Sequence, residues 1–260
     1  MAHTIANLHY AARLINPDGD WRWLKEVSVR LAAGAHPINR FSRLVPPAHT
    51  LDFGIALMDT AFDLPLTAHW RRHLQYRDGL IITFLSLWPI RRRSITALTV
   101  ADLSVDDAGV VVRLEVPDTK AKREESNRLP REIAPYVRRY LNVVRPILLH
   151  GQVDDGLWPS RKGGRVRGGS IYSIVRTRIR TRFGKDMGLH DMRRAAATYI
   201  AMDMPDKVGL IPGVLQHAGP EVGEQHYNFA NAMKASVRYA DTMAGLKAKL
   251  RAKKSVEGDS

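Results

Sequence analysis

The chain has 260 residues, of which 45% are hydrophobic, so it can bury a sizeable core as one large domain or a domain with an appendage. Its formal net charge of +14 indicates a polyanionic partner, and nucleic acid fits better than membrane because no apolar run approaches the roughly 20 residues of a spanning helix. No signal peptide opens the chain, and the absence of cysteine excludes disulfides and thiolate chemistry. A reducing cytoplasm is therefore the expected compartment.

The N-terminal region is expected to be helical and to end in a linker. Residues 1–45 combine apolar positions with arginines, and Asn16–Gly19 breaks the helical pattern. Pro46 and Pro47 indicate an extended connection, so we assign residues 46–63 to a linker. Residues 64–260 then form a second domain that ends in a basic helix or tail.

The second domain opens with helix and strand patterns. Residues 64–87 have helical periodicity, whereas 103–116 are rich in strand formers around Asp106–Gly109 and predict a β-hairpin. Pro135 fits the first turn of a helix that runs to about Leu149. We therefore predict an α+β fold that is mainly α, with a small antiparallel sheet.

The rest of the chain is rich in basic residues. Residues 161–169 form a glycine-rich basic loop, which is either a flexible solvated loop or a phosphate-contacting one. A helix with four arginines is expected from about Ser170, and another over 190–202. Residues 232–254 again have a helical pattern and end in a basic tail, which is either disordered or packs on a neighbouring protomer.

Short motifs that carry chemically reactive side chains follow one another through this domain. They are Pro89–Leu98 with Arg91, Asp118–Lys122 with Lys120, Leu189–Arg194 with His190 and Arg193, Leu215–His217, and His226–Asn228 with Tyr227. Arg91 stands eleven residues before Asp102, and Asp102 belongs to the segment Leu98–Leu103. The ordered set is far more specific than any single member.

This order resembles the catalytic half of the tyrosine recombinase, or phage integrase, family. In that family an arginine opens the helix that leads to a Leu-x-x-x-Asp-Leu segment, and a lysine lies in a β-hairpin turn. A His-x-x-Arg, a Leu-Gly-His and a tyrosine follow. The resemblance covers roughly residues 65–240 and implies a tyrosine recombinase catalytic fold, preceded over 1–45 by part of a helical core-binding domain. Gln216 and Ser94 stand where the family more often has glycine and an acidic residue.

The resemblance assigns the cationic groups to charge stabilisation. Attack of a tyrosine phenolate on a phosphodiester forms a pentacovalent phosphorane, whose extra negative charge must be met by fixed cations. Arginine suits non-bridging oxygens because its planar fork donates two parallel hydrogen bonds. Arg91 and Arg193 would form that pair, and His217 would add a third donor.

The remaining groups would move protons and carry the DNA. Lys120 would protonate the 5′-hydroxyl leaving group, and His190 would accept or orient the Tyr227 proton. Tyr227 would hold the DNA as a 3′-phosphotyrosine, so neither a metal nor another cofactor is expected.

Each assignment has a structural alternative. Arg91 belongs to a run of three arginines, which is usually a solvated or phosphate-contacting face, and Lys122 competes with Lys120. The histidine at 217 is also a conceivable metal ligand with His226, although zinc normally needs three or four organised ligands. Tyr227 is one of eight tyrosines, which are commonly half-buried packing residues.

His190 and Arg193 also have two interpretations. They are three residues apart and would project from neighbouring positions on one helix face, where Met192, Ala195 and Ala196 mark the apolar side. Alternatively they are a helix-start histidine and a surface charge.

We therefore expect a recombinase or integrase that cleaves and rejoins double-stranded DNA, for a mobile element or prophage. Further DNA contacts are expected from Arg92, Arg93, Lys122, Arg161, Lys162, Arg165 and Arg167. A homo-oligomer, a tetramer on DNA, is expected, in a bacterial cytoplasm and associated with the nucleoid. The alternatives are a DNA-binding relic of an integrase with weakened catalysis and an enzyme like type IB topoisomerases.

Overall fold

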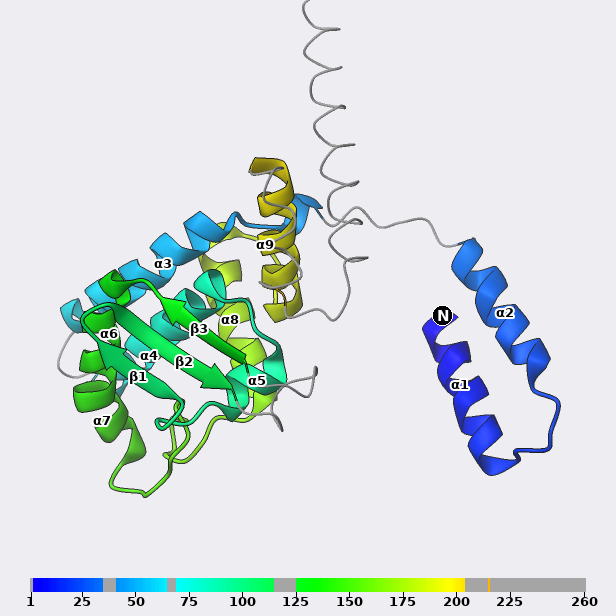
Figure 1. The fold of residues 1–260 in the computed structure, drawn as a ribbon, viewed down its shortest axis with the longest axis horizontal. Helices are drawn as coiled ribbons and strands as arrows, with labels where there is room; N and C mark the ends of the chain where they lie inside the picture. The colour runs from blue at the N-terminus through cyan, green and yellow to red at the C-terminus, as the bar shows by residue number, and fades with distance from the viewer. Residues whose placement is uncertain (1, 35–40, 65–68, 115–124, 204–214, 216–260) are drawn as a thin grey trace, which may run out of the picture. The chain divides into compact units, whose positions relative to one another are not determined.

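The computed structural model describes residues 2–34, 41–64, 69–114, 125–203 and 215 (Figure 1). The chain divides into two compact units, Met1–Ser42 and Arg43–Ser260. The described residues are mainly helical, with one three-stranded sheet in the order β1-β2-β3. This confirms the α+β, mainly α fold class predicted from the sequence.

The first unit is a pair of helices that pack on each other. They are α1 (Ala2–Ile15) and α2 (Arg22–Ala33), and the break between them falls where Asn16–Gly19 predicted it. The Trp21 indole N–H donates to the Asn16 carbonyl over 2.8 Å, which fixes the turn. Leu24 is the one buried apolar side chain among residues 4–34.

The expected linker over 46–63 is instead regular structure within the second unit. After η1 (Phe41–Arg43), α3 spans Pro47–Asp59 and η2 spans Thr60–Asp63. Pro47 occupies the first turn of α3, where its missing N–H has no cost, so the proline pair begins a helix rather than a linker. Helix α3 then packs on α4 (His69–Leu87), the helix predicted over 64–87.

Glycines let α3 and α4 approach closely. A Cβ built on Gly54 would lie 2.5 Å from the Thr83 hydroxyl, and one built on Gly79 would lie 2.6 Å from the Gly54 carbonyl. No larger residue fits at either position without moving backbone. Helix α3 is therefore part of the second unit and not a spacer between units.

Helix α4 is the centre of the core. Leu80, Ile81, Ile82 and Leu85 are at most 1% exposed, and α3, α7, α8 and α9 all contact this helix. Each fully buried aliphatic side chain of this kind contributes about 1.5–3 kcal/mol. The helix ends at Leu87, because the proline at 89 disfavours helical geometry at the residue before it.

A short helix and the sheet follow. Helix α5 spans Arg92–Ala97, and the strands are β1 (Leu103–Asp106), β2 (Gly109–Leu114) and β3 (Glu125–Leu129). The strands are antiparallel neighbours, with β2 in the middle (Figure 1). The hairpin predicted over 103–116 is confirmed. The first four of the five residues of β3 are polar, so its own pattern did not indicate a strand.

The helix predicted from Pro135 to Leu149 is confirmed as a continuous helical stretch. It comprises η5 (Arg131–Ile133), α6 (Ala134–Arg139), the π-helical turn η6 (Tyr140–Val144) and α7 (Arg145–Leu149). Tyr140 is fully buried and donates its hydroxyl to the Leu157 carbonyl over 2.7 Å. Burial raises the pKa of this phenol.

Two further helices complete the described fold. Helix α8 spans Gly168–Phe183 and ends at Gly184, whose φ of 65° closes the helix in the left-handed region. Helix α9 spans Leu189–Asp203, and Met192, Ala195 and Ala196 on it are buried as predicted. Both helices contact α4 and each other.

Candidate active site

Arg91 lies at the start of α5, as the sequence predicted. Its backbone is extended, with φ −70° and ψ 154°, and its carbonyl accepts the Ile95 N–H over 3.0 Å. A tight turn precedes it, in which the Ile90 N–H donates to the Trp88 carbonyl over 2.7 Å. The arginine side chain is half-buried and emerges from the hydrogen-bonded corner between α4 and α5.

Arg193 connects this corner to a distant part of the chain. Its side chain on α9 is buried, at 7% exposure, and its two terminal nitrogens donate to the carbonyls of Pro89 and Leu215. Pro89 stands two residues before Arg91, and Leu215 two residues before His217. The guanidinium thus joins the backbone beside one predicted catalytic residue to the backbone leading to another.

His190 and Arg193 differ in their environment although they share the first turns of α9. His190 is exposed, whereas Arg193 is buried. The N-terminal turn of α9 is capped by Asp191, whose carboxylate accepts the Gly188 N–H over 3.1 Å. The cap therefore fixes the first turn of α9, on which the exposed His190 lies.

Three of the predicted catalytic residues lie outside the described residues. They are Lys120, His217 and Tyr227, and Lys122, the competitor of Lys120, also lies outside. In the sequence, Lys120 and Lys122 fall between the antiparallel strands β2 and β3, whose last pair is Leu114 and Glu125. The roles of all six catalytic candidates stay predictions.

The arginine run lies beside the N-terminus of α8. Arg92 and Arg93 are exposed, and a Cβ built on Gly168 would lie 3.7 Å from the Arg92 side chain. Arg167, also exposed, precedes α8 directly. The structure therefore brings together basic residues that are about 75 positions apart in the sequence.

The glycine-rich loop is folded into a hydrogen-bonded turn. The Ser160 N–H donates to the Gly164 carbonyl over 2.7 Å, and the Val166 N–H to the Trp158 carbonyl over 2.8 Å. Gly163 and Gly164 both have positive φ, of 77° and 61°, which a side chain would strain. Of the two interpretations of this loop, the freely flexible one does not fit this hydrogen bonding.

The cations on this turn are not equivalent. Arg161 stacks on the Trp70 ring, with 4.1 Å between the guanidinium carbon and the ring centroid, and Lys162 is exposed beside it. Arg165 donates to Asp155 over 2.8 Å, so part of its charge is already neutralised. Arg161 and Lys162 are therefore better placed than Arg165 to meet a phosphate.

A buried ion cluster beneath this turn was not recognised in the sequence. Arg77 and Asp78 are 5% and 6% exposed; Arg77 donates to Asp78 over 2.7 Å and to the Pro159 carbonyl over 2.7 Å. Arg178 of α8 donates to the other Asp78 oxygen over 2.9 Å. Opposite charges at adjacent positions, directly before the apolar run of α4, were the available signal, because buried charges are normally paired.

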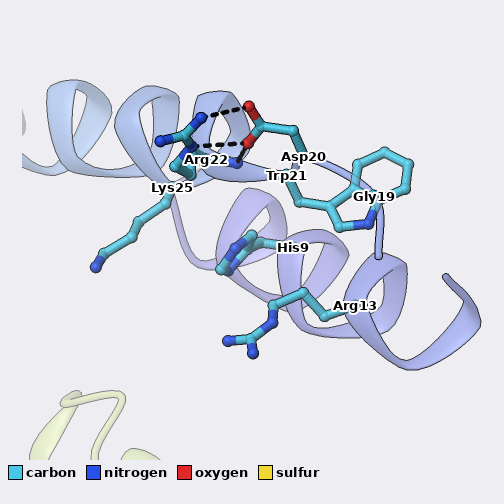
Figure 2. A pocket seen from close by; sticks show the side chains of 7 residues that line it. All are labelled: His9, Arg13, Gly19, Asp20, Trp21, Arg22 and Lys25. Carbon is cyan, nitrogen blue, oxygen red and sulfur yellow. Dashed lines mark hydrogen bonds and ion pairs between the residues drawn. The ribbon is translucent and has the colours of Figure 1, made fainter. Parts of the chain in front are cut away.

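The first unit has a basic surface of its own. A pocket of about 500 Å³ lies between its helices, lined by His9, Arg13, Gly19, Asp20, Trp21, Arg22 and Lys25. Figure 2 shows His9 and Arg13 of α1 and Lys25 of α2 projecting toward the same side. Arg22 is instead paired with Asp20, and its hydrogen bonds lower the pKa of that carboxyl to about 2.

The described parts of the chain offer neither a metal site nor a membrane-spanning helix. No group of three or more His, Cys, Asp or Glu residues there could hold a metal ion. None of the helices described is both long enough and apolar enough to cross a membrane.

Known proteins share this sequence pattern and fold. No protein-family model matches the chain. It is 24% identical over 162 residues to tyrosine recombinase XerD of Chlorobaculum tepidum, a match that covers 62% of this chain. The chain spans about half the length of that relative, at 50%.

Solved structures of recombinases have the same fold. A post-cleavage complex of the XerH site-specific recombinase, bound to palindromic difH substrate, gives a TM-score of 0.55 at 18% identity and covers 73% of this chain and 51% of that one. The XerA recombinase gives 0.52 at 15% identity and covers 90% and 81%.

The described residues, mainly helical with one small sheet, thus have a fold similar to that of these two recombinases. The chain is therefore similar in sequence to a tyrosine recombinase and similar in fold to site-specific recombinases.

Proposed function

We propose that this chain cleaves and rejoins double-stranded DNA through a covalent bond to Tyr227. The observation that carries the proposal is the Arg193 guanidinium, which donates to the carbonyls of Pro89 and Leu215. It joins the backbone beside Arg91 to the backbone two residues before His217. Such a connection supports a site assembled from these segments around one phosphate.

In the proposed reaction the Tyr227 oxygen attacks the scissile phosphorus while the bond to the 5′ oxygen breaks. The phenolic proton passes to His190, and Lys120 donates a proton to the departing 5′ oxygen. Arg91, Arg193 and His217 meet the negative charge of the phosphorane. Attack by a 5′-hydroxyl on the phosphotyrosine reverses these steps and releases rejoined DNA.

Duplex DNA is the proposed partner, because exposed cations lie on several elements around Arg91. They belong to α5, to the turn at 160–164 and to the start of α8, and comprise Arg92, Arg93, Arg161, Lys162 and Arg167. We further propose that the reaction serves a mobile element or prophage, that protomers assemble as a tetramer on DNA, and that the protein acts in a bacterial cytoplasm at the nucleoid.

The test is a nicked suicide substrate, from which cleavage releases a short strand and traps the enzyme on DNA. Tyr227→Phe keeps the ring but removes the nucleophile, so the covalent adduct should disappear while DNA binding persists. Tyr239→Phe is the matched control and should leave the adduct unchanged. Adduct formation by Tyr227→Phe, or its loss only in Tyr239→Phe, would show that the assignment is wrong.

A modified version of this substrate shows which of the two lysines acts as the acid. A sulfur at the bridging 5′ position makes the leaving group good without an acid, so Lys120→Ala should regain cleavage on that substrate. Lys122→Ala should cleave both substrates with little change. Rescue of Lys122→Ala alone would transfer the role of acid to Lys122.

The second candidate function is DNA binding without catalysis, as in a relic of an integrase. The departures at Gln216 and Ser94 favour it, since both stand within motifs of the proposed site. A wild-type protein that binds duplex DNA but forms no adduct would support this alternative. A type IB topoisomerase-like activity would instead relax supercoiled DNA without exchange between two duplexes.

A further inference from the structure

The segment that opens the second unit packs against the turn before α9. The Arg43 Nε donates to the Asp186 carbonyl over 3.1 Å, and a terminal nitrogen of the same guanidinium donates to that carbonyl as well. Two residues further on, the Val45 N–H points to the Met187 sulfur at 3.4 Å, and both side chains are buried. The chain is therefore attached to residues 186–187 where it enters this unit.

The same turn is held from a second direction by α8. The Arg176 Nε and a terminal nitrogen donate to the two Asp186 carboxylate oxygens over 2.5 and 3.0 Å. These hydrogen bonds, with the nearby charge of Arg43, lower the pKa of the Asp186 carboxyl. Asp186 thus meets one guanidinium at its side chain and another at its backbone, so its position is tightly defined.

The held turn leads directly into the first turn of α9. Arg43 lies 3.8 Å from the Asp191 carboxylate, the same group that caps the Gly188 N–H. Asp191 is well shielded, at 13% side-chain exposure. Arg43 therefore touches both the turn before α9 and its cap, on either side of His190 in the sequence.

We propose that Arg43 is a positioning residue, which holds the start of α9 so that His190 stands at a fixed place relative to Arg91. The inference rests on the proposed function. Arg193, farther along α9, ties the helix to Pro89, so α9 is fixed to the rest of the site at two points. Proton transfer needs heavy atoms within hydrogen-bond reach, and a displacement of about 1 Å can slow a reaction on the order of 100-fold.

The experiment measures the single-turnover rate at which the full chain with Arg43→Gln forms the adduct on the suicide substrate. We expect a rate lowered about 10- to 100-fold, with duplex affinity changed no more than in the control. The control is Arg113→Ala, which removes one exposed arginine from β2. Should Arg43→Gln destabilise the protein, Arg43→Lys keeps the charge and one donor, and an intermediate rate is expected from it.

A double-mutant cycle with His190→Ala tests whether Arg43 acts through the histidine. If it does, Arg43→Gln slows the wild type but adds little to His190→Ala. Multiplicative losses in the double variant, or an unchanged rate in the single variant, overturn the inference while the proposed function stands. A wild type that forms no adduct overturns both.

Discussion

The two units use their basic residues differently. In the first unit, Leu24 is the one apolar side chain buried among residues 4–34, and the arginines of that range, Arg13, Arg22 and Arg30, are exposed. In the second unit, several arginines donate to main-chain carbonyls: Arg43, Arg72, Arg77, Arg138, Arg145 and Arg193. The net charge of +14 therefore overstates the charge that is available to bind phosphate.

The largest effect is expected where an arginine serves the fold and the proposed site together. Arg193→Lys keeps the charge but cannot reach both the Pro89 and Leu215 carbonyls. We expect a loss of about 2–4 kcal/mol in the free energy of unfolding, since hydrogen bonds to charged groups contribute about 1.5–3 kcal/mol each. Adduct formation should also fall by orders of magnitude.

Arg91→Lys is the comparison for Arg193→Lys, and denaturant unfolding is the measurement. The Arg91→Lys substitution should lower cleavage as much as Arg193→Lys does, with a smaller loss in the free energy of unfolding. Equal stability losses in the two variants would contradict a special structural role for the buried arginine. If DNA binding is lost in parallel with cleavage, both residues contact phosphates in general and have no specific role in the cleavage step.

A second prediction concerns apolar burial in the two units. Leu80→Ala removes a fully buried side chain from the core around α4 and should cost about 2–5 kcal/mol. Leu24→Ala should leave the main thermal transition nearly unchanged, because the helices of the first unit form a separate compact unit. Calorimetry of both variants decides this. An equal shift of the main transition by Leu24→Ala would show that the units unfold together.

The third prediction concerns salt. If Arg13 and Lys25 of the first unit meet phosphates, the variant with Arg13→Gln and Lys25→Gln should reduce the slope of log affinity against log salt by about 2, since each phosphate contact contributes about 0.9. Arg145→Gln removes one arginine whose guanidinium donates to the Gly156 carbonyl, and it should lower stability but leave the slope unchanged. A salt series with a fixed duplex measures both.

The same series tests specificity. Phosphate contacts position a protein without specifying bases, so a scrambled duplex should bind nearly as well as a cognate one. Tight, salt-insensitive and strongly sequence-specific binding would contradict the proposal that exposed cations supply the affinity.

The smallest effect is a pH dependence that arises from one ion pair of the second unit. The Asp186 pKa is lowered below its ordinary value of 3.8, because Arg176 hydrogen bonds to the carboxylate. Its contribution to stability is present above the ordinary pKa and is lost as the pH falls through the lowered one. The stability difference between wild type and Arg176→Gln should therefore shrink as the pH falls from about 6 to about 2. Thermal melts across this range measure it, and a difference that grows on acidification would contradict the assignment.

Local patterns predicted many elements of the fold, and their failures have physical causes. The strand formers at 110–112 and the periodicity around Met192 and Ala195 indicated the hairpin and α9, because each pattern reflects burial on one face. The linker predicted from the proline pair at 46–47 was wrong, since proline suits the start of a helix as well as a linker. The mostly polar strand β3 has no such pattern, and its pairing with β2 determines its conformation.

By itself, the sequence determined the order of the reactive groups and the family they resemble, because motif spacing is a property of the chain. It could not distinguish an exposed cation from a structural one. Only the tertiary structure decided that Arg193 is buried between the Pro89 and Leu215 carbonyls while Arg92 remains exposed. The physical reason is that a guanidinium acquires its hydrogen-bond partners from segments distant in sequence, which meet only when the core around α4 is packed.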